Sequence, residues 1–177
     1  VSGVTDANSP TTQSTTGAWT PPTMATIGTR IIVTHPGFPG GATKFGYFDI
    51  STPSAPAWAA GDLVTNALAS TPTAVANFRN RAYFATGQTL PYTDVLDPLT
   101  RTNSTQSLTI GDTSAITALV GMPVQTTSSG VVAALIVFKD FQIWKVTGDT
   151  VTSDLAENFL SLSIGSSSPR SIAQSPL

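Results

Sequence analysis

The chain has no cysteine, one histidine, one glutamate and few charged residues of either sign. Without cysteine, disulfides and thiolate metal sites are excluded, and one histidine cannot form a multi-histidine metal centre. Only 10% of the 177 residues are charged, and the formal net charge is -2. Because proteins that grip nucleic acid present strongly basic grooves, this composition argues against sequence-specific DNA or RNA binding.

Long apolar segments are also missing. A membrane-spanning helix needs about eighteen or more apolar residues in a row, whereas the longest apolar run here, residues 131–138, has the length of a strand. Ser and Thr make up about a quarter of the chain, with 14 Gly and 13 Pro. These residues favour turns and strand edges. The composition therefore predicts an all-β fold with long Ser/Thr/Pro/Gly-rich loops and no membrane span.

Three aromatic-rich hairpins recur about every fifty residues. Their first strands centre on Ile32, Tyr83 and Ile136, which are 51 and 53 positions apart. A period of this size is typical of β-propeller blades, small sheets that cannot bury both of their faces alone. We therefore expect propeller-like blades of antiparallel hairpins. The expected pairs are residues 30–34 with 47–50, 81–85 with 92–95, and 135–139 with 143–146.

The chain divides into a polar N-terminal arm or linker, residues 1–25, and a β-rich repeat domain, residues 26–177. Residues 168–172 resemble the opening of a further unit, and a closed propeller needs at least four blades. We therefore expect the sequence to be a fragment of a larger protein, incomplete at its C-terminus.

Other segments carry weaker patterns. Alternation predicts that Tyr83, Ile136, Phe138, Trp144 and Val146 are core residues. Residues 114–120 fit a strand or a short helical turn, residues 154–159 a helical turn, and residues 160–164 a strand. Loops are expected at residues 35–41, 51–73, 97–107 and 123–130.

A series of short motifs follows in a defined order between Asn77 and Ile172. It comprises Arg81-Ala82-Tyr83-Phe84-Ala85-Thr86-Gly87, Tyr92-Thr93-Asp94, Gly111-Asp112, Ile116-Thr117-Ala118-Leu119, Ala134-Leu135-Ile136-Val137-Phe138-Lys139, Ile143-Trp144-Lys145-Val146-Thr147-Gly148-Asp149 and Ser167-Ser168-Pro169-Arg170-Ser171-Ile172. This series resembles the tail nozzle, or tail-hub, proteins of short-tailed bacteriophages, which contain β-propellers. The resemblance covers a little over half of the chain.

The resemblance implies a structural virion protein at the distal end of the phage tail tube. It implies a ring of identical subunits, six in such nozzles, around a channel for DNA retention and ejection. The implied partners are other tail proteins, such as an adaptor and fibres or spikes, and DNA that passes without sequence-specific binding. The protein would be made in the host cytoplasm and located in the virion.

Residues suited to catalysis are few. The single histidine, His35, precedes Pro36 in a Gly/Pro loop, where a structural role is favoured over a Ser-His-Asp triad. Asp49 and Asp94 occupy equivalent repeat positions, as a glycosidase pair could. Because the third repeat has Lys145 there, turn or surface roles are favoured. We therefore predict that the protein is not an enzyme and has no catalytic residue.

Metal and cofactor sites are not expected either. Asp112, Asp140 and Asp149 could contribute oxygen ligands, but no loop has the Asp-x-Asp-x-Asp pattern with a closing Glu of a calcium site. The glycines of residues 37–41 lack the Lys-Ser/Thr ending of a phosphate loop. We predict no cofactor and no metal.

An alternative function is a carbohydrate- or host-receptor-binding β-propeller module. Its loops would present Trp58 and Phe38 to a ligand. If the protein instead forms the phage-tail ring, its subunits would contact one another through residues 1–25, 51–72 and 97–107, which look too polar and Pro-rich to be core. A weakly acidic, Ser/Thr-rich lining would let DNA slide through a channel.

Overall fold

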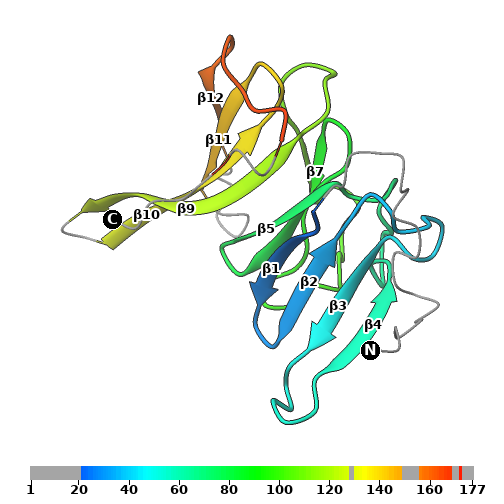
Figure 1. Cartoon of the computed structure of the whole chain (residues 1–177). Coiled ribbons are helices and arrows are strands. Elements are labelled where there is room, and N and C mark those ends of the chain that lie inside the picture. Colours follow the sequence, from blue (N-terminus) through cyan, green and yellow to red (C-terminus); the bar gives the residue numbers. More distant parts are fainter. Residues whose placement is uncertain (1–20, 128–129, 149–155, 169–171, 173–177) are drawn as a thin grey trace.

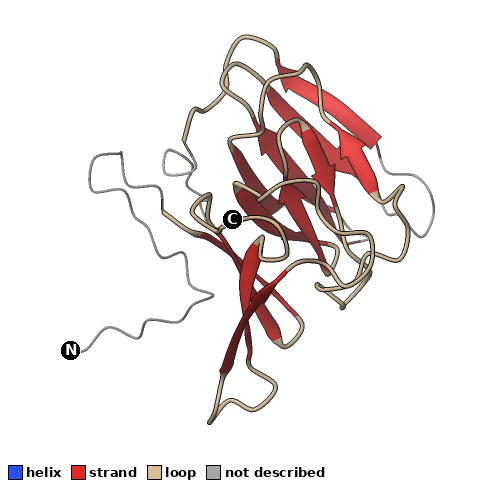
Figure 2. Cartoon of the chain, turned by 90° about the vertical axis from the view of Figure 1, so that its right-hand side faces the viewer, coloured by secondary structure: helices blue, strands red, loops and turns tan. Residues whose placement is uncertain are grey.

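The computed structural model describes residues 21–127, 130–148, 156–168 and 172. This part of the chain is built of strands and loops, without a helix (Figure 2), which confirms the all-β prediction. It accordingly contains no helix long and apolar enough to cross a membrane. The strands are β1 (Thr23–Ile27), β2 (Arg30–Thr34), β3 (Phe45–Asp49), β4 (Ala57–Gly61), β5 (Ala74–Phe78), β6 (Arg81–Ala85), β7 (Thr89–Pro91), β8 (Ser107–Thr109), β9 (Ala118–Thr127), β10 (Gly130–Phe138), β11 (Ile143–Thr147) and β12 (Ala156–Ser161).

The strands form four antiparallel sheets, two with four strands and two with two strands, in which neighbours in the chain are paired (Figure 1). The first sheet is β1-β2-β3-β4 and the third sheet is β9-β10-β11-β12. Between them, the hairpins β5-β6 and β7-β8 are joined by a bridge between Tyr83 and Tyr92 and by a 3.0 Å bond from the Thr93 N–H to the Ala82 carbonyl. Together they form the middle sheet. None of the sheets is closed.

The middle sheet has apolar side chains on both faces and packs on both neighbours. Since side chains alternate along a strand, neighbouring residues of β5 and β6 enter different cores. One face packs against the first sheet, where the buried residues are Ala25, Ile27, Ile32, Phe45, Leu63, Leu68, Val75, Ala82 and Phe84. The other face packs against the third sheet, and this core contains Ala74, Ala76, Phe78, Tyr83, Ala85, Leu90, Tyr92, Ile110, Ile116, Leu135, Val137 and Val146.

The first strands of the three sheets lie beside one another. The Asn77 side-chain amide of β5 donates to the Thr26 carbonyl of β1 at 2.7 Å, and the Val75 N–H of β5 donates to Thr23 Oγ1 of β1 at 3.0 Å. On the other side, β9 comes so near β5 that a Cβ on Gly121 would lie 2.1 Å from the Asn77 carbonyl oxygen. Strands β1, β5 and β9 therefore share one edge of the stack.

The first and third hairpins pair as predicted, β2 with β3 and β10 with β11. The second prediction is confirmed only in part. Residues 81–85 pair along their length with β5, and residues 92–95 reach them through the Tyr83–Tyr92 bridge and the bonds between Thr93 and Ala82. The reason is a two-residue turn at Arg79 and Asn80, whose φ angles of 53° and 57° are those of a tight hairpin turn without glycine.

Three predicted non-strand segments are strands. Residues 51–73 contain β4, and residues 154–159, expected to be a helical turn, supply most of β12 from Ala156 onward. Residues 123–130 were expected to be a loop, but β9 continues to Thr127. Pro123 is tolerated there because β9 is an edge strand and the pairing is irregular opposite Val132 and Ala133. Conversely, of the strand predicted at residues 160–164 only Leu160 and Ser161 belong to β12, and only Ser161 has a partner across the sheet.

The predicted core is confirmed for Tyr83, Ile136 and Val146, which are buried, but Phe138 and Trp144 are only half-buried. Segments expected to be too polar for the core also contribute to it. Leu63 and Leu68 from residues 51–72 are buried, and Leu99 from residues 97–107 packs against the same core. The arm proposed at residues 1–25 contributes its residues 23–25 to β1, and residues 1–20 lie outside the described chain.

Candidate functional site

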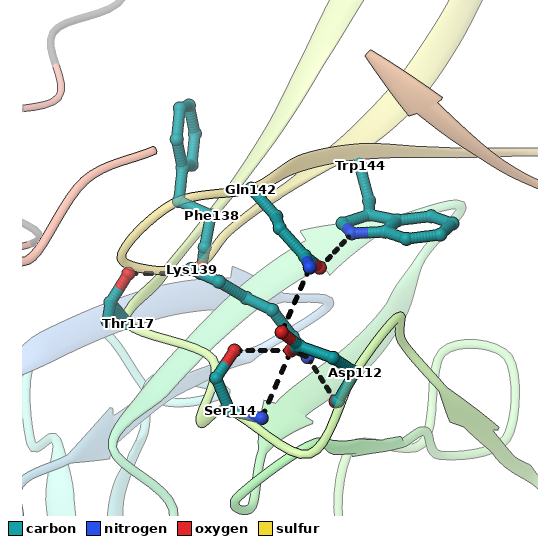
Figure 3. Close-up of polar contacts among 7 residues, drawn as sticks. All are labelled: Asp112, Ser114, Thr117, Phe138, Lys139, Gln142 and Trp144. Carbon is teal, nitrogen blue, oxygen red and sulfur yellow. Dashed lines mark hydrogen bonds and ion pairs between the residues drawn. The ribbon is translucent and has the colours of Figure 1, made fainter. Parts of the chain in front are cut away.

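The most developed polar cluster surrounds Asp112 and Lys139 (Figure 3). Lys139 follows β10 and is completely buried. Its Nζ donates to the Asp112 carbonyl at 2.6 Å and lies 3.1 Å from the Asp112 carboxylate. The other carboxylate oxygen accepts from Gln142 Nε2 at 3.0 Å, and Gln142 in turn accepts from the Trp144 indole N–H at 2.9 Å. The loop after β8 is thereby fixed to the β10-β11 turn.

This cluster is electrostatically suited to a structural role. The hydrogen bond from the Ser114 hydroxyl, followed by that from Lys139, lowers the pKa of Asp112 to about 2. A general base works best with a pKa near the working pH. Asp112 is instead ionised at neutral pH, where it compensates a buried ammonium group. The residue considered as a calcium ligand therefore serves as the counter-ion of Lys139.

Asp94 is engaged within its own loop. Its two carboxylate oxygens accept from Thr102 Oγ1 at 2.6 Å and from Gln106 Nε2 at 2.7 Å. Burial acts to raise the pKa of Asp94, but these hydrogen bonds prevail and hold it below the usual value. Asp94 thus stays ionised and orders residues 94–106.

Asp49 has separate partners. Its carboxylate accepts from the Ser51 N–H at 2.9 Å and lies 3.8 Å from Arg30, which also lies 3.6 Å from Asp97. Hydrogen bonds to Ser51 lower the pKa of Asp49. A glycosidase acid needs a raised pKa, and neither Asp49 nor Asp94 has one. Their equivalent places in the repeat correspond to loop-ordering contacts.

His35 is nearly buried at the end of β2. Its Nδ1 accepts from the Gly37 N–H at 2.8 Å, and its carbonyl accepts from the Phe38 N–H at 3.1 Å. These bonds form the turn that leaves the strand. Phe38 is only 4% exposed, so the expectation that this loop presents Phe38 to a ligand is wrong.

Metal ligands do not gather in the part of the chain that the structure describes. No three His, Cys, Asp or Glu side chains there could hold a metal ion together. Asp140 is exposed beside the β10-β11 turn, and Asp149 lies outside the described residues.

A second feature is an apolar sheet surface, which we call the front face. It consists of the side chains of the first sheet that point away from the middle sheet. Among them, Met24 is 64% exposed, Phe48 is 37% exposed, and the Phe48 and Trp58 rings lie 4.7 Å apart. The register assigns to this face Met24, Thr26, Ile31, Val33, Gly46, Phe48, Trp58 and Ala60.

Gly46 allows the front face to be flat. The Trp58 indole lies across it so closely that a Cβ at Gly46 would be 2.0 Å from an indole carbon. None of the eight positions is charged, and Thr26 has the only polar side chain. The sequence prediction missed this surface because Trp58 was placed in a loop rather than in β4.

Comparisons of the chain with models of protein families, with curated proteins and with solved structures found no match.

Proposed function

We propose that the chain is a structural virion protein of a short-tailed phage, located in the nozzle or hub at the distal end of the tail. In this proposal the three sheets are blades of β-propeller type, and identical subunits form a ring around the channel for DNA retention and ejection. Adjoining tail proteins, such as an adaptor and fibres or spikes, would hold the ring in place.

One observation carries the proposal. Two four-stranded sheets pack on opposite faces of a middle layer made of the hairpins β5-β6 and β7-β8, with β1, β5 and β9 side by side at one edge. Blades of a propeller are arranged in this way around a central axis. The resemblance of residues 77–172 to tail nozzle proteins is the reason for proposing a tail as the location of this stack.

The placement of basic residues supports a conduit. Lys44 pairs with Asp62, Lys139 pairs with Asp112, and Arg30 lies near Asp49 and Asp97. Lys44 and Lys139 are buried as well as paired, so they are withdrawn from the surface, and the charge of Arg30 is partly neutralised by its two carboxylate neighbours. A surface of this kind lets a polyanion pass with little retention.

A carbohydrate- or receptor-binding module remains the second candidate, and the exposed Phe48-Trp58 pair is the observation that favours it. Aromatic rings can stack on sugars. However, a ligand site also needs a few convergent polar groups, and Thr26 is the only polar side chain among the front-face residues. This second candidate therefore ranks below the structural one.

The proposal is tested in the phage whose genome encodes the chain. We expect purified virions to contain the protein in a fixed number of copies per tail, in a ring at the tail tip labelled by antibody in electron micrographs. Particles made without it should fail to retain or eject DNA. Absence of the protein from virions, or normal packaging, retention and ejection without it, would end the proposal. Specific binding to a glycan array, lost on Trp58→Ala, would favour the second candidate.

A further inference from the structure

We propose that the front face of the first sheet is a docking surface for a second copy of this chain, which contributes the outer face of its third sheet. We call that outer surface the back face. The contact would be head to tail and would continue between subunits the stacking seen within one chain. The inference deepens the proposed ring and rests on the self-association that the ring requires.

The first argument is the direction of stacking inside the chain. The side of the middle sheet that carries Val75, Ala82 and Phe84 is covered by the first sheet. The corresponding side of the third sheet, with Leu135 and Val137, is covered by the middle sheet. In both cases one face of a sheet is covered by the sheet that precedes it in the chain. The front face is the equivalent side of the first sheet, and no preceding sheet in the described chain covers it.

The second argument is composition. The front face combines exposed Met24 and Phe48 with half-buried Ile31, Val33 and Trp58. Monomeric proteins rarely leave a whole sheet face apolar and uncharged. Two stacked sheets approach to about 10 Å, which requires flat surfaces without buried charges. The indole lying across Gly46 supplies that flatness.

The third argument is the surface at the other end of the stack. The ring of Phe138 points away from the Lys139-Asp112 contact (Figure 3). On this face Ala118, Ala134 and Ile136 are buried, the half-buried side chains are mostly apolar, and Lys145 is the single charge. The pairing of β9, β10, β11 and β12 assigns to the back face Ala118, Val120, Met122, Ala134, Ile136, Phe138, Ile143, Lys145, Thr147, Ala156 and Asn158. Next to Phe138 the surface continues into a hollow of about 670 Å³ that Phe141 and Ile172 also line.

The two end faces differ from each other, so a contact between them is heterologous. Repeating such a contact produces a ring if the rotation closes and a filament if it does not. A front-to-front contact would instead stop at a dimer. The geometry of stacking within the chain favours the first arrangement, since no sheet there packs front to front.

The experiment uses sedimentation velocity on the 177-residue chain at concentrations up to about 100 μM, where a micromolar contact is nearly saturated. One variant, Met24→Lys with Phe48→Lys, places charges on the front face. A second variant, Ile143→Lys, does so on the back face. Val64→Lys is the matched control, because Val64 is 77% exposed and lies in a loop outside both faces. Far-UV circular dichroism and thermal melting verify folding. Should the double variant fail to fold, Thr26→Lys, exposed on the same face, replaces it.

We expect the unmodified chain and Val64→Lys to associate beyond a dimer, and each face variant to associate at least about tenfold more weakly. A mixture of the front and back variants should form a one-to-one complex and stop there, because only one productive contact remains. A monomeric unmodified chain, a front variant that associates normally, or a back variant that dimerises alone would each overturn the inference. If the chain is monomeric but virions contain it as a ring, the docking inference fails and the proposed function stands. If the chain associates head to tail but is absent from virions, the docking inference stands and the proposed function fails.

Discussion

Gly121→Ala tests the close approach between the middle and third sheets. Gly121 lies in β9 opposite Leu135, at the point where β9 passes β5. An added Cβ would lie 2.1 Å from the Asn77 carbonyl oxygen and 3.3 Å from its carbon, whereas ordinary contacts begin at 3.4 Å. The oxygen belongs to the backbone and cannot rotate away. Strands β5 and β9 would therefore have to separate by the difference between 3.4 and 2.1 Å, or 1.3 Å.

The loss in free energy of unfolding depends on the contacts that this separation of β5 and β9 disturbs. Added methyl groups in well-packed regions usually cost about 1–3 kcal/mol. We expect the upper half of that range, because Asn77 is also bonded to Thr26 and the strand that moves carries the buried residues Ala76 and Phe78. Against a total stability of about 5–15 kcal/mol for a domain, this is a substantial loss.

Gly61→Ala is the control for the same chemical change. Gly61 also lies in a strand, nothing is within 4 Å of its added Cβ, and its φ is not positive. The free energy of unfolding should stay the same or rise by up to about 1 kcal/mol, because alanine restricts the unfolded chain. Guanidinium titration followed by far-UV circular dichroism measures both variants. If the two free energies of unfolding agree within about 0.5 kcal/mol, β5 and β9 are not as close as described and the reasoning is refuted.

Three further predictions concern the core and the Asp112 cluster. Tyr83→Ala should lower the free energy of unfolding by about 3–5 kcal/mol in denaturant titration, because the ring is 1% exposed and stacks on Tyr92 at 5.1 Å. Trp144→Ala should cost less, about 1–3 kcal/mol, since its ring is half-buried; a larger loss than for Tyr83→Ala contradicts this ranking. Asp112→Asn should lower the melting temperature at pH 7. Because the folded pKa of about 2 lies below the ordinary 3.8, the stabilisation is present above that ordinary value and is lost as pH falls toward 2. A melting-temperature gap that stays constant from pH 7 to pH 2 contradicts the proposed contact with Lys139.

The sequence predicted elements whose signals are local. In the first and third hairpins the paired strands carry long runs of aromatic and β-branched residues, and the pairing follows directly. In the middle hairpin the pairing of residues 81–85 with β5 was missed, because β5 has small residues at Ala74 and Ala76 and the turn at Arg79 and Asn80 lacks glycine. Asn is the residue that tolerates positive φ there, and this was the available signal.

The contact between Lys139 and Asp112 could not be predicted from the sequence, for a different reason. Lys139 and Asp112 are 27 positions apart and meet only because β9 and β10 bring the two loops together. Their residue types are common on surfaces, so nothing in the sequence marks Lys139 as completely buried. The Asp94 contacts with Thr102 and Gln106 are closer in sequence, and the prediction of a turn-ordering role for Asp94 agrees with them.

The front face was missed because the first sheet is apolar on both sides. Period-two patterns identify a strand when one face is polar, but Ile31, Ile32 and Val33 alternate between two surfaces that are both hydrophobic. The same property explains why a chain with 40% hydrophobic and 10% charged residues needs more than one sheet. A linear stack of sheets with two apolar faces always leaves one such face at each end, whereas a closed ring leaves none. The described residues form a linear stack with the front face at one end and the back face at the other. In the ring proposed above, those two faces would be buried between neighbouring subunits.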